Sequence, residues 1–278
     1  MSSQEMLTVL IPCKDERHNI LDCIDSVRDI ADEILVADSG STDGTLELVK
    51  DLPGVRVIER EYVNSADFKN WAIPQATHEW VLVLDADERV TSDVAMSARK
   101  VIAEPNDCEA FAVRRDTYML GHRLRYSGAQ SATCTRLFRS HLRYQPRRVH
   151  ADIEVAAEKV GTLDGKLEHH TCQCLNRFLQ TQNRYSTWAA LDALDSGKRA
   201  GFWSLALRPP LKFLQFYFLR LGFLDRTPGL LWCGVVAYYN LMKYAKLWEL
   251  SHSRTKQAQH IESADDNLPE PVQSRQAA

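Results

Sequence analysis

Short apolar runs alternate along the first 90 residues with segments whose apolar positions recur at helical spacing. The predicted strands lie at residues 7–11, 33–37, 55–58 and 80–84. The predicted helices begin near Ile20, Leu46 and Ala66. Apolar runs without polar alternation are typical of strands that are buried on both faces. Strands and helices in strict alternation therefore predict an α/β fold with a doubly wound, mostly parallel sheet flanked by helices.

The run at 80–84 ends in three carboxylates within four residues: Asp85, Asp87 and Glu88. An open α/β sheet binds its ligands at the carboxyl ends of its strands, so these charges lie where a site is expected. The two carboxylates of an Asp-x-Asp pair can converge on one hard cation, because Mg or Mn prefers oxygen ligands and phosphate. Asp38 follows a neighbouring strand, in a turn that Gly40 and Gly44 permit. The alternative for an isolated Asp-x-Asp is a solvated acidic turn.

The pattern after residue 90 is less regular. It predicts a helix that is capped by Thr91 or Ser92 and runs to about Glu104, and a strand at 110–113. A further helix, from Asn176 to Leu194, is amphipathic and is expected to cover the cleft.

The segment 202–250 is dense in aromatic and aliphatic residues and carries six basic residues and two acids. The stretches Arg208-Pro209-Pro210 and Pro228-Gly229 are expected to break it into two amphipathic helices, and the chain has no apolar run of about 18 residues. Aromatic and basic side chains together favour helices that lie in a membrane interface. The alternative is packing against the preceding α/β domain or a second subunit, as in a homodimer. The tail at 251–278 is polar and is expected to be disordered.

The composition limits which binding partners and which cellular compartment are expected. A net charge of −3 and 26% charged residues give no support to a nucleic-acid partner. The seven cysteines show no disulfide spacing and no signal peptide is recognised, so a reducing cytoplasm is expected.

Two clusters in the second half invite a chemical interpretation. Residues 114–148 hold nine Arg and one acid, Asp116, which predicts either recognition of an anionic ligand or a solvated face with internal ion pairs. His169-His170 stands beside Cys172-x-Cys174, but the matching second half of a zinc site is missing.

Three stretches, TVLIPCKDERHNI, EILVADSGSTDGT and ADFKNWAIPQATHEWVLVLDADE, resemble the nucleotide-sugar half of family 2 glycosyltransferases, which are inverting enzymes with a GT-A-type fold. The subgroup that they resemble is that of the lipopolysaccharide core β-1,4-glucosyltransferases. The resemblance covers about the first hundred residues in order and spacing, and it resumes more weakly after Gly201.

The resemblance implies a role for each matching residue. Pro12, Glu16 and Asp38 would line the uridine pocket, with a carboxylate accepting the imide hydrogen of the base. Lys69 and Asn70 would lie by the nucleotide, and Asp85 would contact the ribose or a metal-bound water, with Ala86 next to it in the nucleotide-sugar site. Asp87, together with Asp85, would hold the divalent ion, Mg or Mn, that bridges the diphosphate.

The family also implies a carboxylate base in the stretch Val149 to Glu154, where many relatives have a His-Glu pair. Here Ala151 follows His150, so the base is Asp152 or Glu154. On a strand both would point to the same side as His150. His150 is either a metal or diphosphate contact or a structural hydrogen bonder. The subgroup that the chain resembles often has a His shortly before the next helix, which implies that one of His169 and His170 faces the active site.

These observations predict a GT-A-type glycosyltransferase domain at 1–200, with a nucleotide-sugar half at 1–104 and an acceptor half at 105–200, and an amphipathic helical appendage at 201–250. The expected reaction moves a sugar from a UDP-sugar to a saccharide or lipid-linked acceptor, with an anionic one as an option, in cell-envelope or lipopolysaccharide synthesis. The expected location is the inner face of the cytoplasmic membrane. The alternatives are a membrane-associated nucleotide-sugar-binding module without catalysis, and a nucleotidyltransferase.

Overall fold

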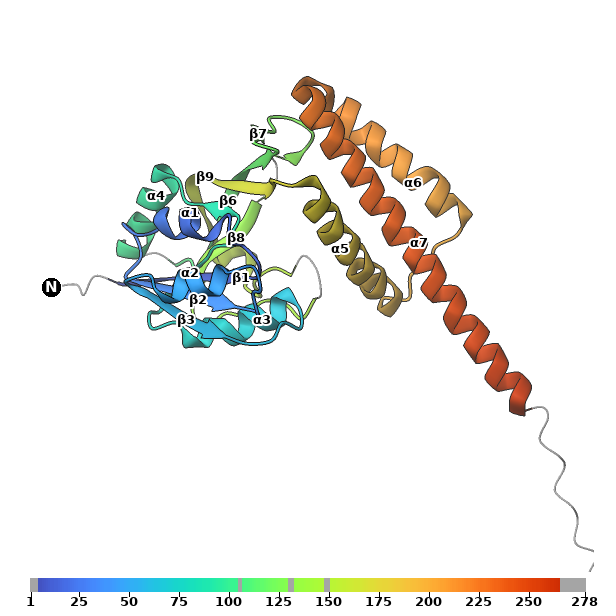
Figure 1. Cartoon of the computed structure of the whole chain (residues 1–278), viewed down its shortest axis with the longest axis horizontal. Coiled ribbons are helices and arrows are strands. Elements are labelled where there is room, and N and C mark those ends of the chain that lie inside the picture. The colour runs from blue at the N-terminus through green and yellow to red at the C-terminus, as the bar shows by residue number, and fades with distance from the viewer. Residues whose placement is uncertain (1–4, 105–106, 130–132, 148–150, 266–278) are drawn as a thin grey trace, which may run out of the picture.

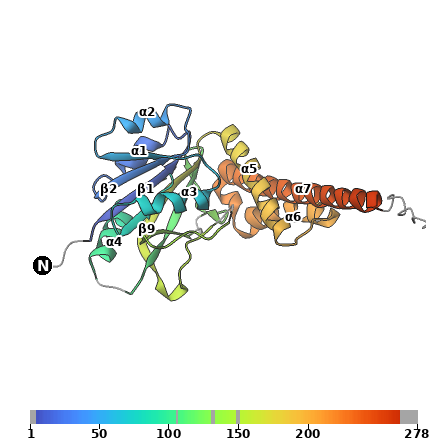
Figure 2. The same ribbon diagram turned by 90° about the horizontal axis from the view of Figure 1, so that it is seen from below.

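The computed structural model describes residues 5–104, 107–129, 133–147 and 151–265. It shows a β-sheet with helices on both faces, and three further helices that project together from one end of the sheet (Figures 1 and 2). The α/β class and the helical appendage that the sequence predicts are both confirmed.

The first half of the chain forms the parallel part of the sheet, in the strand order β3-β2-β1-β4. Its strands are β1 (Leu7–Cys13), β2 (Glu33–Asp38), β3 (Val55–Glu59) and β4 (Trp80–Val83). Its helices are α1 (Ile20–Asp25), α2 (Thr45–Lys50), α3 (Ser65–Ala72) and the 3-10 turn η1 (Ile73–Gln75). β1 and β4 are almost completely buried, as expected for strands that helices cover on both faces.

The rest of the sheet is mostly antiparallel and extends the order to β8-β6-β9-β5. Its elements are β5 (Glu88–Arg89), α4 (Ser92–Ala103), β6 (Ala110–Met119), β7 (His122–Arg123), β8 (Thr133–Arg139), the 3-10 turn η3 (Ala157–Lys159) and β9 (Val160–Cys172). β8 pairs antiparallel with β4, and β9 pairs antiparallel with β5. The β5–β9 register sets Glu88 opposite His169. This pairing brings the end of β9 to the acidic stretch that follows β4.

The helical unit consists of α5 (Leu175–Asp195), α6 (Phe202–Leu214), the π turn η4 (Gln215–Leu219), the 3-10 turn η5 (Gly222–Asp225) and α7 (Arg226–Asp265). α5 lies beside α7 in Figure 1, and Ala190 and Ala193 of α5 share a small core with Leu247 of α7. The predicted boundary at 200/201 falls between α5 and α6, and α5 packs on α7 across it.

Two helices are present between residues 202 and 250, but the break between them differs from the prediction. α6 continues through Pro209 and Pro210, and Pro228 lies in the first turn of α7. A proline in a first turn removes no helical hydrogen bond, so it starts a helix rather than breaking one. The chain turns instead at η4 and η5, where Leu221 and Arg226 have positive φ angles. Within the described residues, none of the helices has the length and hydrophobicity that a bilayer span requires.

Candidate active site

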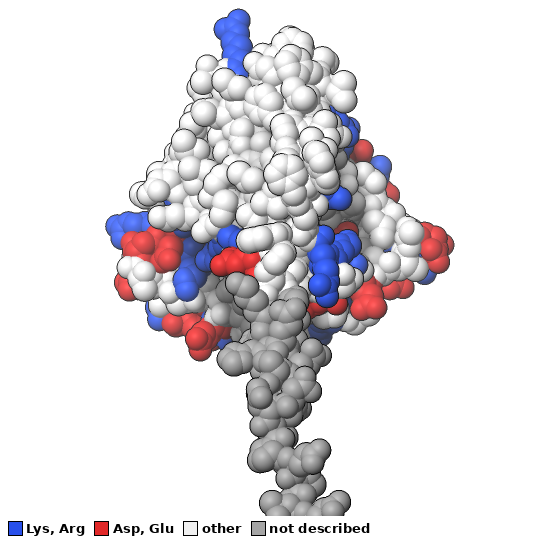
Figure 3. All heavy atoms as spheres, turned by 90° about the vertical axis from the view of Figure 1, so that its right-hand side faces the viewer, with Lys and Arg blue, Asp and Glu red and all other residues white. Residues whose placement is uncertain are grey.

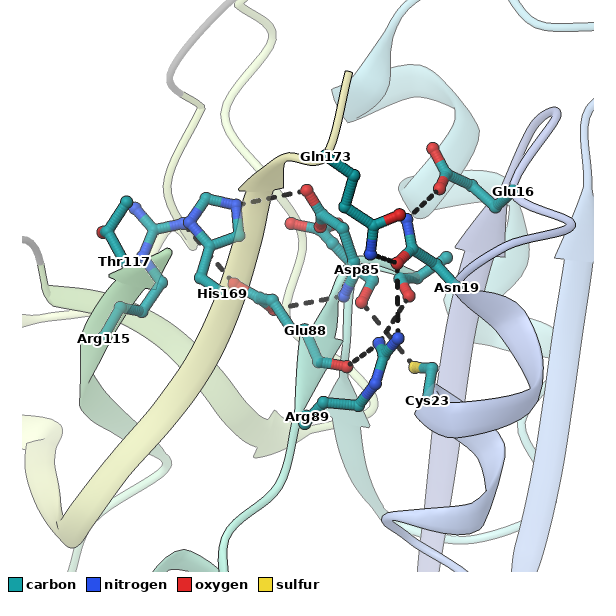
Figure 4. Close-up of polar contacts among 12 residues, drawn as sticks. Glu16, Asn19, Cys23, Asp85, Glu88, Arg89, Arg115, Thr117, His169 and Gln173 are labelled. Atoms are coloured by element: carbon teal, nitrogen blue, oxygen red, sulfur yellow. Dashed lines mark hydrogen bonds and ion pairs between the residues drawn. The ribbon is translucent and has the colours of Figure 1, made fainter. Parts of the chain in front are cut away.

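The acidic stretch after β4 lies at the carboxyl end of the sheet, as the strand pattern predicts (Figure 4). Its three carboxylates differ in environment. Glu88 is fully buried, whereas the side chains of Asp85 and Asp87 are 34% and 28% exposed. Ala86 between them is buried. Only the two aspartates can therefore meet a ligand directly.

Asp87 pairs with His169 across the sheet, with 3.3 Å between the carboxylate Oδ2 and the imidazole Nε2. The backbone adds a second link, since the amide of His170 donates to the carbonyl of Asp87 at 2.8 Å. Burial opposes the charge on both side chains, but their attraction prevails: it lowers the pKa of Asp87 and raises the pKa of His169. One histidine of the predicted pair thus contacts the acidic stretch.

Asp85 is held between two buried cations. The ammonium of Lys69 on α3 lies 2.8 Å from its Oδ1, and the guanidinium of Arg136 on β8 contacts its Oδ2. Arg136 also donates to Glu88 at 2.7 Å. Burial would raise the pKa of Asp85, but Arg136 and Lys69 together hold it well below its usual range. Asp85 is thus ionised and fixed in place, with one edge still exposed.

A hydrogen-bond chain closes the other side of the site, where Figure 4 shows Glu16 and Asn19 facing Asp85. Asn19 donates to Glu16 at 2.7 Å and accepts from Gln173, which follows β9, at 2.7 Å. Arg177 of α5 reaches Glu16 at 3.1 Å. Burial raises the pKa of Glu16, and the nearby charge of Asp87 adds to this effect. The loop after β1 is thereby tied to the end of β9 and the start of α5.

Asp38 and Pro12 lie on the adjoining strands. Asp38 is fully buried, and its carboxylate accepts hydrogen bonds from the backbone of Gly40 and Ser41 at 2.8 Å each and from the Ser41 hydroxyl. Gly40 has φ +85°, so the turn uses the left-handed conformation that the sequence suggested. In this structure Asp38 orders the 39–41 turn, and Pro12 lies half-buried at the end of β1 beside it.

Asn70 clamps a backbone segment instead of facing Asp85. Its amide donates to the carbonyl of Tyr144 at 2.9 Å, and its carbonyl accepts from the amide of Tyr144 at 2.8 Å. The ring of Tyr144 lies 5.3 Å from the ammonium of Lys69. The Lys69-Asn70 pair therefore connects the acidic stretch to the segment around Tyr144.

The candidate bases follow on the strand-like segment opposite Tyr144, which bridges to Ile153. Ile153 is buried, whereas Asp152 and Glu154 on either side of it are exposed. Residues two apart on an extended segment share a face, so both carboxylates point away from the core. His150, the third predicted residue, lies outside the described residues.

Four arginines of the arginine-rich stretch pair with carboxylates in the described parts of the chain. Arg115 and Arg136 contact Glu88, Arg123 contacts Asp116, and Arg139 contacts Glu5 and Glu79. Internal ion pairs therefore account for much of its positive charge. These arginines are close together in the sequence, but the sequence could not show that, among those that the structure describes, Arg136 is the one that reaches Asp85.

No group of three or more His, Cys, Asp or Glu side chains within the described parts of the chain is arranged to hold a metal ion. His169, Arg136, Gln173 and Arg177 join the site from β8, β9 and α5. The resemblance implied that one of His169 and His170 faces the site, whereas the other three positions depend on contacts between distant residues that no local pattern indicated.

Comparison with known proteins gives matches along most of the chain. The lipopolysaccharide core biosynthesis glycosyltransferase LpsC of Rhizobium meliloti is 28% identical over 242 residues, which are 85% of this chain and 86% of LpsC. An uncharacterized glycosyltransferase of Rickettsia typhi is 26% identical over 262 residues, 88% of this chain and 87% of that protein. Among solved structures, S. aureus TarS is 14% identical with a TM-score of 0.46, covering 90% of this chain and 91% of TarS.

The family model of glycosyl transferase family 2 matches residues 8–162. This segment runs from β1 into β9 and includes the strand ends that carry Asp38, Asp85 and Asp87. It covers more than half of the 278 residues, and the chain therefore belongs to glycosyl transferase family 2.

Proposed function

We propose that this glycosyltransferase moves a sugar, with inversion, from a UDP-sugar to a saccharide or lipid-linked saccharide of the cell envelope, such as lipopolysaccharide. The observation that carries the proposal is the Asp87–His169 pair at the carboxyl end of the sheet, with Glu16 close enough to feel the charge of Asp87. The name of LpsC, which refers to lipopolysaccharide core synthesis, supports this acceptor class.

The residues present fit a divalent ion, Mg or Mn, that is bound together with a diphosphate. Such an ion keeps several waters and uses one or two protein ligands plus phosphate oxygens, so a larger protein cluster is not required. Asp87 is ionised and partly exposed, and His169 adjoins it. Both oxygens of Asp85 already face cations, so we assign direct ligation to Asp87 and His169 and leave Asp85 the ribose or a bound water. When bound, the ion would neutralise charge on the leaving diphosphate.

The proposed step is one in-line displacement. Asp152 or Glu154 takes the proton of the acceptor hydroxyl as its oxygen attacks the anomeric carbon on the face opposite the diphosphate. The bond from that carbon to the diphosphate oxygen breaks, and the configuration inverts. Glu16 and the Asp38 turn would line the uridine side, and the Lys69–Asp85–Arg136 cluster keeps the sugar side rigid.

We place this reaction at the cytoplasmic face of the membrane, because a lipid-linked acceptor is anchored there and the helical unit lies at the same end of the sheet as the site. The helical unit follows directly from β9, whose residue His169 belongs to the site (Figure 1).

The test is turnover of nucleotide sugars by the full-length protein, with and without Mn. The Asp87→Asn variant is expected to lose at least about a hundredfold in turnover and to lose metal-dependent UDP binding, because charge stabilisation of the diphosphate is removed. Asp29→Asn, at an exposed acid that follows α1, serves as the matched control and should behave like wild type.

Normal turnover in Asp87→Asn would remove the central assignment. Tight UDP binding by the wild type without turnover of any donor sugar would favour the binding module without catalysis.

A further inference from the structure

A row of exposed apolar side chains runs along α6 and continues into η4. The row recurs at intervals of four, four, three and four residues, which places it on one helix face. We define this apolar stripe as Trp203, Leu207, Leu211, Leu214 and Phe218, whose exposed fractions are 69, 47, 58, 47 and 53%. Leu219 next to it is 80% exposed, and Leu221, Phe223 and Leu224 in and beside η5 are exposed as well.

The stripe is on the side of α6 that faces away from α7. Pro209 of α6 is buried, and Arg208 stacks on the ring of Tyr244 in α7 at 4.8 Å. Figure 3, which looks at the molecule from the side of α6 and α7, shows a broad area over these helices without charged side chains, and charges gather below it. An exposed apolar area of this extent marks an interaction surface.

Charge indicates what covers the stripe. Residues 202–250 carry six basic residues and two acids. One of the acids, Asp225, is occupied by hydrogen bonds from the backbone of Arg125 and Tyr126 at 2.9 Å. Arg208 and Lys212 contact Tyr244 and Gln215, and among the described residues neither they nor Arg220 pair with a carboxylate. The rim of the stripe is therefore positively charged.

An apolar face with a positive rim is complementary to an anionic lipid surface. A second copy of the chain would instead bring the same positive rim against this one, which like-charge repulsion disfavours. Exposed Trp203 and Trp248 are of the type that is enriched at membrane–water interfaces. A helix that lies in the interface buries its apolar face about 5–10 Å deep, which a single stripe on a 13-residue helix can satisfy.

We propose that α6, η4 and η5 form a membrane-docking surface, which inserts the apolar stripe into the headgroup region of an anionic bilayer. Lys246, although basic, is not part of it: its ammonium donates to the Asn183 carbonyl and to the hydroxyls of Ser186 and Thr187, and so joins α7 to α5. This surface gives the membrane location proposed above a structural basis. It uses no residue of the catalytic site, so it can fail while the enzyme assignment stands.

The test measures binding of the full-length protein to vesicles of phosphatidylcholine with phosphatidylglycerol by sedimentation. The Leu207→Ser, Leu211→Ser double variant is expected to bind at least about tenfold more weakly, because two exposed side chains lose their apolar burial in the bilayer. The matched control is Leu21→Ser, Met96→Ser, which removes two equally exposed apolar side chains from the sheet domain. It should bind like wild type.

A charge variant tests the rim separately. Arg220→Gln with Lys212→Gln should weaken binding to these vesicles by about fivefold for each residue at low salt, and less at high salt. With vesicles of phosphatidylcholine alone the two substitutions should have little effect.

Three outcomes would overturn the proposal. The first is that the wild type stays in solution with anionic vesicles, and the second is that the stripe variant binds as tightly as the control. The third is that the wild type forms a stable dimer that the stripe variant abolishes. The last outcome, seen by light scattering, would make the surface a subunit interface.

Discussion

At the scale of single residues, the two candidate bases share a face because Ile153 between them is buried. If Asp152 accepts the proton, Asp152→Asn should lower transfer by about a hundredfold or more while donor binding persists. Glu154→Gln should then be mild. The measurement is steady-state transfer together with UDP binding by calorimetry.

The reverse pattern would move the role of base to Glu154. Two fully active variants would place the base outside this segment, for example among residues that the structure does not describe.

The acidic residues of the site could be placed from the sequence, because a buried strand that ends in carboxylates fixes where they lie. The residues that pair with these carboxylates could not be placed in the same way. His169 reaches Asp87 through the β5–β9 register, which joins residues about eighty positions apart, and β9 mixes Asp, Lys, Glu and His without a clear alternation. Likewise, of the arginines in the described parts of 114–148, Arg136 reaches Asp85, and the pairing of β8 with β4 places it there.

At the scale of elements, Glu33 joins the amino ends of neighbouring strands. Its carboxylate accepts from the hydroxyl of Thr8 on β1 at 2.6 Å and from the amide and hydroxyl of Thr77, before β4, at 2.8 Å each. Arg56 on β3 adds a salt bridge. Partial burial opposes the charge, but these hydrogen bonds prevail and lower the pKa of Glu33 to about 2.

We expect Glu33→Gln to lower the free energy of unfolding by about 2 kcal/mol at neutral pH. A carboxyl group whose pKa is depressed on folding stabilises above its unfolded value, and this contribution is lost as the pH falls toward the folded pKa. The difference between variant and wild type should therefore shrink between about pH 4.5 and pH 2.

Urea unfolding across this pH range provides the measurement. The control is Glu59→Gln, which removes an exposed pair with Lys50 and should change stability little at any pH. A difference for Glu33→Gln that does not depend on pH would show that its charge plays no part.

The strands of the parallel half of the sheet could be predicted from their apolar runs. The position of the break between the two helices of residues 202–250 could not be predicted from the prolines. Pro209 and Pro210 lie inside α6, and Pro209 is buried, although a proline within a helix removes a hydrogen bond and was expected to end it. Pro228 was placed at a break, yet it lies in the first turn of α7, where proline fits.

At the scale of the whole molecule, the inner strands of the sheet and the α5–α7 pair each have an apolar core, and a further cluster joins the two parts. It contains Met119 of β6 and Cys172 of β9 together with Phe178 of α5 and Val235 of α7. The two apolar clusters of the sheet contain only residues from Leu7 to Leu167. The helical unit is held by contacts of its own, including the α5–α7 core around Leu247 and a stacked pair, Phe178 of α5 on Trp232 of α7, at 6.3 Å. The sheet should therefore keep its structure when α6 and α7 are removed.

A chain that ends at residue 201 retains α5 but loses the helix that covers it. Its backbone amides in β1 and β4 should keep their protection in hydrogen exchange, while those of α5 should exchange at least about a hundredfold faster, since α5 has lost most of its buried contacts. A chain that ends at residue 174 loses Phe178 and the Arg177–Glu16 contact as well, and so uncovers Met119 and Cys172 on the sheet side. Loss of protection in β1 and β4 of the first chain would show instead that sheet and helical unit fold as one cooperative body, because strands with an independent core have no reason to open when α7 is absent.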